Sequence, residues 1–227
     1  MAGTRSRTGA KAGLSRGRVL RAALELADRE GIEKLSMRKL GAELGVEAMT
    51  LYHYVPNKAA LLDGLVELVV SAVRPAAGPP VGDASADAWS ADAWPARLHG
   101  FAVALRAELL RHPGVIPLVA TRPARSAAAL RAVEDTAAAL AGAGVEPLRA
   151  LRIVNAVATF VIGHCLAEAA TTPGHPEEAD APLDLADFPT LAAAVAAGLG
   201  TPEDHRARFA LALDALLGGL AAAPAAG

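Results

Sequence analysis

Apolar residues recur along this chain with the period of an α-helix. Within residues 15–30, four of them stand at positions i, i+3, i+4 and i+7: Leu20, Ala23, Leu24 and Ala27. This spacing places them on one face of a helix. Because Gly31 follows the stretch, we expect a helix from Ser15 to about Glu30 that the glycine ends.

Two short helices follow, separated by a glycine turn. Ser36 is suited to cap a helix over 37–43, Gly45 to make the turn, and residues 47–53 to form the next helix. The residues expected to form a small core between them are Leu40, Leu44, Val46 and Leu51. Two short helices joined by such a turn are typical of a helix-turn-helix.

The rest of the chain predicts longer helices with two irregular interruptions. Asn57 caps a mostly apolar fourth helix, and helical patterning resumes at Trp94. The interruptions are the Pro-, Gly-, Ala- and Asp-rich residues 75–93 and the acidic, proline-rich residues 171–189. Thr201, followed by proline and two acids, begins the last helix.

Charge is distributed unevenly between the two parts of the chain. Residues 1–60 hold eleven Lys and Arg against six Asp and Glu, whereas residues 61–227 hold eleven Arg against eighteen Asp and Glu. A basic end on an acidic body indicates a polyanionic partner, although chain ends are also basic for no specific reason.

Cysteine usage and hydropathy bear on the compartment. Cys165 is the single cysteine, which excludes an internal disulfide and favours a reducing cytoplasm. The N-terminus lacks the apolar segment of a secretory signal. The longest uncharged apolar stretch, 153–167, is short for a bilayer and contains Asn155 and His164, so we expect no membrane association.

The third helix is expected to expose side chains that can contact DNA. With the core residues turned inward, five side chains remain mainly outside: Ala48, Met49, Thr50, Tyr52 and His53. They can reach base edges and phosphates in a major groove. For Tyr52 the alternative is that its ring packs the helix, but a buried phenol then needs a hydrogen-bond partner.

The stretch GIEKLSMRKLGAELGVEAMTLYHYVPNKAALLDGL, residues 31–65, resembles the DNA-binding region of the TetR family of bacterial repressors. The closest positions are Leu40, Leu44-Gly45-Val46, Thr50-Leu51-Tyr52, Asn57-Lys58 and Leu61-Leu62. A weaker resemblance, to the tetracycline-repressor-like C-terminal class, extends over Thr121-Arg122-Pro123, the helix around Gly163 and the last helix.

The resemblance implies an all-α homodimer with three parts in each chain. These are a flexible arm at 1–14, a three-helix helix-turn-helix domain at 15–60, and a helical effector-binding and dimerisation domain at 61–224, which the long fourth helix joins to the DNA-binding domain. The implied partners are double-stranded DNA with a palindromic operator and a small-molecule effector.

Carried over by position, the resemblance assigns DNA contacts to nine residues. Arg38 and Lys58 meet phosphates or groove edges, with Ser36 at the start of the second helix. The base-edge positions are Ala48, Met49 and Thr50, and the backbone-holding positions are Tyr52, His53 and Tyr54. Since Ala48 and Met49 stand where tetracycline-responsive members carry polar and proline side chains, we expect a different operator.

The body departs from those members at both of their metal contacts, where this chain has Leu118 and Ala167. We therefore expect no metal, no cofactor and a mostly apolar effector. The predicted pocket lining is Phe101, Leu105, Leu118, Thr121, Val133, Asn155, Val157, Phe160 and His164. An equally open alternative is that Asn155 and His164 are core residues hydrogen-bonded to backbone or water.

A dimer needs an apolar seam, and two helices offer one. The expected interface residues are Leu151, Leu166, Phe209, Leu213, Leu216, Leu217 and Leu220, in a four-helix bundle across the two-fold axis.

Two rival functions fit the sequence less well. An enzyme would have to use residues such as His164 and Cys165, which project about 100° apart on a helix and cannot act as a base–nucleophile pair. A non-specific architectural DNA binder needs broad positive charge, which the acidic body lacks. A regulator that activates transcription, or acts without a ligand, stays open.

Overall fold

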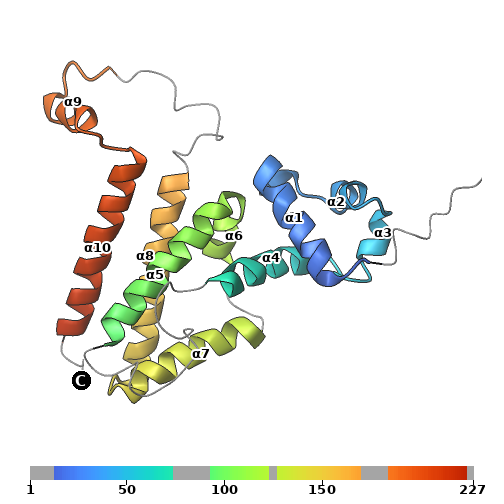
Figure 1. Ribbon diagram of the computed structural model, residues 1–227, viewed down its shortest axis with the longest axis horizontal. Helices are drawn as coiled ribbons and strands as arrows, with labels where there is room; N and C mark the ends of the chain where they lie inside the picture. Colours follow the sequence, from blue (N-terminus) through green and yellow to red (C-terminus); the bar gives the residue numbers. More distant parts are fainter. Residues whose placement is uncertain (1–12, 74–92, 123–126, 170–183, 224–227) are drawn as a thin grey trace, which may run out of the picture. The chain divides into compact units, whose positions relative to one another are not determined.

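The computed structural model describes residues 13–73, 93–122, 127–169 and 184–223 (Figure 1). Helices and their connections make up these described ranges, which contain no strand, so the predicted all-α class is confirmed. The chain divides into two compact units: Met1–Val73 with Arg111–Leu130, and Arg74–Leu110 with Arg131–Gly227. The predicted arm at 1–14 and the predicted irregular segments at 75–93 and 171–189 lie largely outside the described residues.

The first unit begins with helices whose starts are set by side-chain caps. Its helices are α1 (Arg16–Glu30), η1 (Ile32–Lys34), α2 (Met37–Glu43), α3 (Ala48–Leu51) and α4 (Lys58–Ala72). The side chains of Ser15, Ser36 and Asn57 accept hydrogen bonds from backbone N–H groups in the first turns of α1, α2 and α4. Each cap satisfies a donor that the helix itself leaves without a partner. The caps predicted at Ser36 and Asn57 are confirmed.

The third helix is shorter than the predicted 47–53. α3 ends at Leu51, and Tyr52 and His53 lie in the following turn. The His53 and Tyr54 amides donate to carbonyls three residues back, at 3.4 and 2.9 Å. Such bonds tighten the backbone at the end of a helix instead of extending its regular ladder.

The turn between α2 and α3 depends on two glycines. A β-carbon at Gly41 would lie 2.8 Å from the carbonyl oxygen of Val46 and 3.1 Å from the amide nitrogen of Ala48. Only a residue without a side chain lets these backbones approach so closely. Gly45 has φ +66°, as the predicted turn requires. Leu40 and Leu51 are fully buried beside them, whereas Leu44 and Val46 are half-buried.

A later segment of the chain returns to the first unit. It comprises η3 (Pro113–Val115) and α6 (Ile116–Thr121), which pack on α1 and α4 respectively. His112 Nδ1 lies 2.7 Å from Asp28 Oδ2, and Arg122 forms an ion pair with Asp63. Gly114 comes so close to α1 that a β-carbon there would lie 2.7 Å from a main-chain oxygen. No local pattern in residues 112–122 indicates that they pack on α1 and α4.

The second unit is built mainly from long helices. These are α5 (Trp94–Arg111), α7 (Ala127–Gly142), α8 (Pro147–Ala169), α9 (Pro189–Ala196) and α10 (Pro202–Ala222), with the ends of α5 and α7 counted in the first unit. α8 and α10 run side by side (Figure 1). The Arg149 guanidinium donates to the carbonyls of Leu220 and Ala223 and so caps the end of α10. Thr201 caps its start, as predicted.

α8 is long and apolar enough to cross a membrane by length and composition. A core helix of a soluble protein meets the same criterion, and one face of α8 is buried in the chain. That face carries Ala150, Ile153, Val157, Val161 and Cys165.

We predict that Gly41→Ala lowers the stability of the first unit by about 1–3 kcal/mol, because the added methyl meets fixed backbone atoms. Gly100→Ala is the matched control: it lies inside α5 with nothing within 4 Å of the added carbon. This second change should add roughly 0.5–1 kcal/mol, because alanine favours a helix. Thermal unfolding followed by circular dichroism checks both, and an unchanged midpoint for Gly41→Ala contradicts the close approach.

Candidate nucleic-acid interface and ligand-binding unit

The first unit places the nine predicted DNA-contacting residues on α2 and its N-cap, on α3 and the turn that follows it, and at the start of α4. The exposed members are Arg38, Met49, Tyr52, His53 and Lys58; the half-buried members are Ser36, Ala48, Thr50 and Tyr54. We call these nine residues the DNA face. Met49 is 71% exposed and Tyr52 41% exposed, which is unusual for large side chains that serve only to pack a helix.

Charged residues near the DNA face differ in whether an acid already engages them. Lys39 Nζ lies 2.6 Å from Glu30, and Arg29 lies 3.0 Å from Glu43. The hydrogen bond from Lys39 lowers the pKa of Glu30 below its ordinary value. Arg38 and Lys58 have no carboxylate partner among the residues that the structure describes. These two cations are therefore available to an external phosphate.

Seven of the nine predicted pocket residues lie in the second unit, on α5, α7 and α8. They are Phe101, Leu105, Val133, Asn155, Val157, Phe160 and His164. Leu105 and Val157 are buried, and Asn155 is exposed. The other two, Leu118 and Thr121, belong to α6 in the first unit. The Thr121 hydroxyl donates to the Pro117 carbonyl at 2.8 Å.

A charged pair lies deep in the second unit, where sequence reasoning had placed only His164. The Arg106 guanidinium donates two hydrogen bonds to Glu168, from Nε at 3.0 Å and from a terminal nitrogen at 2.6 Å. The two side chains are only 15% and 12% exposed. A two-bond arrangement of this kind fixes both groups in one plane and compensates their burial.

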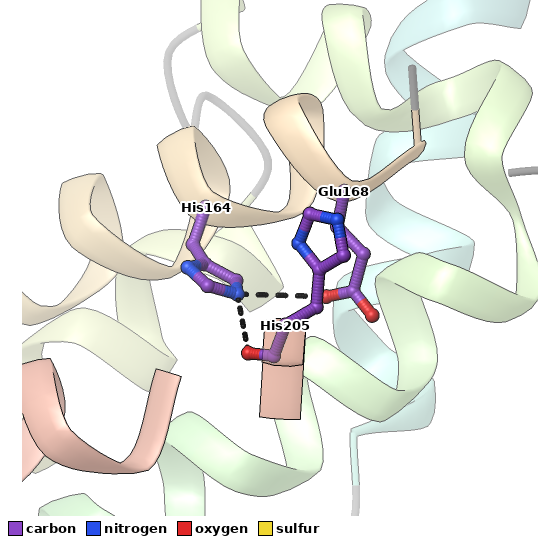
Figure 2. A group of neighbouring side chains, drawn as sticks. All are labelled: His164, Glu168 and His205. Atoms are coloured by element: carbon purple, nitrogen blue, oxygen red, sulfur yellow. Dashed lines mark hydrogen bonds and ion pairs between the residues drawn. The ribbon is translucent and has the colours of Figure 1, made fainter. Parts of the chain in front are cut away.

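Two histidines complete this site, which we call the polar cluster: Arg106, His164, Glu168 and His205. His164 Nε2 lies 3.6 Å from Glu168 Oε2 and donates to the His205 carbonyl at 3.2 Å (Figure 2). The ligand atoms of His164, Glu168 and His205 all lie within 4.8 Å of one another. The i, i+4 spacing of His164 and Glu168 on one helix was the one sequence signal for the polar cluster. The sequence does not indicate that α5 brings Arg106, and α10 brings His205, to these two residues.

Aromatic rings pack around the polar cluster and limit its contact with water. The ring centroid of Phe209 lies 5.1 Å from that of His164 and 5.4 Å from that of Phe160. The Arg106 guanidinium lies 5.1 Å from the centre of the Phe209 ring. These contacts hold His164 in place and shield the charged groups.

Burial shifts the pKa values of two neighbouring side chains. Desolvation lowers the pKa of His164, with the Glu168 carboxylate acting in the opposite direction, so the neutral imidazole is favoured. Desolvation raises the pKa of the Cys165 thiol to about 12. Since the thiolate is the nucleophilic form, Cys165 is a packing residue.

The predicted dimer residues divide into two groups. Phe209, Leu213 and Leu217 are buried within the single chain, on α10, while Leu216 and Leu220 are half-buried. Leu151 and Leu166 lie on α8 with 37% and 36% exposure. The sequence analysis did not single out α9, where Leu191 and Val195, together with the flanking Phe188 and Leu199, leave four large apolar side chains exposed.

The first unit has the architecture of a helix-turn-helix DNA-binding domain, and comparisons with known proteins identify its family. Residues 19–65 match the family described as bacterial regulatory proteins, tetR family. Residues 88–223 match the tetracyclin repressor-like C-terminal domain. The chain therefore belongs to the TetR family of transcriptional regulators, as the sequence resemblance predicted.

Full-length relatives and solved structures agree with this. An HTH-type transcriptional regulator of Saccharopolyspora erythraea is 34% identical over 217 residues, which are 92% of this chain and 85% of the relative. The structure of a possible TetR family regulator from Streptomyces coelicolor A3(2) has a TM-score of 0.71 at 32% identity, covering 91% of this chain and 98% of that one. The Streptomyces coelicolor protein ActR, solved in complex with actinorhodin, has a TM-score of 0.68 at 25% identity, covering 92% and 97%.

We predict that Cys165 resists alkylation in the native protein. At pH 8 a thiol with a pKa of about 12 is ionised in only about one molecule in ten thousand. Iodoacetamide followed by mass spectrometry should therefore find almost no adduct before unfolding. Full modification should follow in guanidinium chloride, because the thiol then regains its ordinary pKa. Rapid labelling of the folded protein contradicts the buried placement.

Proposed function

We propose that this regulator is a repressor, that it binds a palindromic operator as a homodimer, and that a small, mostly apolar molecule releases it. The observation that carries the proposal is the DNA face, where Arg38 and Lys58, with no acidic partner among the described residues, flank exposed Met49 and Tyr52. Phosphate contacts position such a domain, and side chains at the base edges specify the sequence.

The readout we propose for the DNA face is mostly apolar. Ala48 and Met49 carry no hydrogen-bonding group that could read guanine or adenine, whereas both can contact thymine methyl groups. Thr50 adds one hydroxyl, and Tyr52, His53 and Tyr54 contact the sugar–phosphate backbone. Operator selection from a random DNA pool should therefore return half-sites with thymine opposite the start of α3.

The effector is proposed to bind in the second unit. Phe101, Phe160 and His164 are half-buried, which leaves part of each ring to be covered by a ligand. Their surroundings are mostly apolar, as small-molecule sites usually are. ActR, solved in complex with actinorhodin, offers a precedent for a small-molecule ligand in a similar chain. A ligand releases DNA only by binding one conformational state better than the other.

Homodimerisation is supported by the apolar side chains that one chain leaves uncovered. On α8 these are Leu148, Leu151 and Leu166, at 53%, 37% and 36% exposure. They fall on the helix face opposite the buried residues Ile153 and Val157. Such a stripe along a long helix suits a seam with the same helix of a second chain.

Other functions of the same fold are less well supported than a ligand-released repressor. A TetR-family protein that activates transcription, or that acts without a ligand, shares the DNA face and differs in its response to effectors. An enzyme is disfavoured, because the only thiol is held un-ionised and Glu168 is held by Arg106. We place the protein in the cytoplasm, where its DNA is, without membrane association.

The proposed DNA face predicts that Lys58→Ala and Tyr52→Ala each weaken operator binding several-fold without loss of helicity. Lys58→Ala should also reduce the slope of log affinity against log salt by about one, since one phosphate contact is lost. Fluorescence anisotropy with the selected operator at several salt concentrations measures both quantities.

Lys39→Ala is the matched control for the loss of one positive charge, because Glu30 already engages this ammonium. Its salt slope should stay close to that of the unmodified protein. Wild-type binding by both Lys58→Ala and Tyr52→Ala shows that the DNA face is wrongly assigned.

For the dimer, we predict that Leu151→Glu yields folded monomer, because an unpaired carboxylate in an apolar seam costs several kcal/mol. Leu213→Glu is a poorer test, since Leu213 is buried inside its own chain and its loss unfolds the subunit. Val103→Glu, at 45% exposure on α5, is the control and should stay dimeric. Sedimentation velocity distinguishes the two states, and a dimeric Leu151→Glu places the seam elsewhere.

A further inference from the structure

We propose that His164, Glu168 and His205 form a binding site for one divalent transition-metal ion of the zinc, cobalt or nickel class. The site lies within the second unit and joins α8 to α10 (Figure 2). Its ligands are other residues than Leu118 and Ala167, which stand at the metal contacts of tetracycline-responsive members, although Ala167 directly precedes Glu168 on α8. It also revises the expectation from sequence that the chain binds no metal.

Geometry is the first support for the site. The three ligand atoms lie within 4.8 Å of one another. Metal–nitrogen and metal–oxygen bonds in zinc sites are about 2.0–2.2 Å, so two ligand atoms of a tetrahedral site are roughly 3.4 Å apart. Changes in side-chain torsion angles therefore have to bring the ligand atoms together by up to about 1.4 Å, the difference between 4.8 Å and that separation. His164 and Glu168 stand one helical turn apart, the spacing that lets two residues of a helix share one ion.

The donor set selects the kind of metal. Two imidazole nitrogens and one carboxylate oxygen suit zinc, cobalt and nickel, whereas magnesium and calcium prefer oxygen ligands. Three protein ligands leave a fourth position for water or another donor.

Arg106 is compatible with a metal on Glu168. Carboxylates that bind metals commonly accept hydrogen bonds as well, and such partners orient the ligand. Arg106 already fixes the carboxylate plane through two bonds. Its positive charge repels the ion, however, so Arg106 both positions Glu168 and limits the affinity of the site.

Metal binding has to replace two hydrogen bonds of the histidines. For Nε2 of the neutral His164 to bind a metal, its proton has to move to Nδ1, and the hydrogen bond to the His205 carbonyl at 3.2 Å is lost. On His205, Nδ1 accepts from Arg208 at 2.9 Å. Arg208 keeps a second partner, because its Nε also donates to Asp204 at 2.8 Å.

Cobalt(II) titration of the full-length protein without a polyhistidine tag tests the proposal. We expect one equivalent per chain and the intense visible absorption of a four-coordinate cobalt ion, abolished by zinc. His164→Ala and Glu168→Gln should each weaken binding at least tenfold. His99→Ala is the matched control, because His99 also faces a carboxylate, Asp214 at 3.5 Å, but has no third ligand within the described part of the chain. This variant should bind cobalt normally.

Arg106→Gln provides a test in the opposite direction. Removal of the competing charge should strengthen cobalt binding several-fold, which a purely structural role for the polar cluster does not predict. Zinc titration of the unmodified protein followed by histidine-selective NMR keeps the test independent of whether variants fold. Signals of His164 and His205 should shift while that of His99 stays. No cobalt site in the wild-type protein, or zinc shifts confined to other histidines, overturns the proposal.

Discussion

The DNA-binding unit depends on the close backbone contact between α2 and α3. Helices of seven and four residues are too short to be stable alone, so tertiary packing must hold them. The contact at Gly41 brings the two together, and the buried Leu40 and Leu51 fill the space beside it. Because Leu51 is fixed, the rest of α3 has one orientation, and Met49 and Thr50 acquire theirs from it. The exposed DNA face is thus a consequence of a buried contact.

The first unit also contains residues 111–130, which lie far along the chain from residues 1–73. Asp28 on α1 faces His112, and Asp63 on α4 faces Arg122. Surface ion pairs contribute little stability each. The backbone of Gly114, in contrast, lies so close to α1 that any side chain at this position would collide with it. This returning segment follows directly on α5, whose last residue, Arg111, is counted in the first unit.

Sequence reasoning succeeded where the signal is local. The caps at Ser36, Asn57 and Thr201 were predictable because a capping side chain bonds to an amide three residues away. Contacts between residues far apart in the sequence could not be predicted in this way. The stripe of Phe209 and Leu213 showed that one face of α10 is covered, but an apolar stripe does not tell whether its own chain or a second copy covers it.

The polar cluster illustrates the same limit. His164 was visible as a polar residue on an apolar helix, and the sequence left open whether it lines a cavity or is hydrogen-bonded in the core. The hydrogen bond from His164 to the His205 carbonyl gives the imidazole the partner that a buried polar group requires. The same packing also brings the ligand atoms of Glu168 and His205 close to that of His164. A single histidine has no second donor to share a metal with, whereas Glu168 and His205 bring two. The proposed metal site therefore depends on the packing of α10 against α8, which no local pattern of residues specifies.

Arg106 connects the polar cluster to helix α5. Its bonds to Glu168 link α5 to α8, and α5 continues unbroken from Arg106 to Arg111, where the chain joins the first unit. Breaking a buried ion pair is costly, because each charge then lacks its compensation. A ligand or metal that draws Glu168 away must therefore supply Arg106 with another partner or move the helix that carries it. Since α5 is a helix and not a loop, movement at Arg106 is conveyed to Arg111 within about one and a half turns.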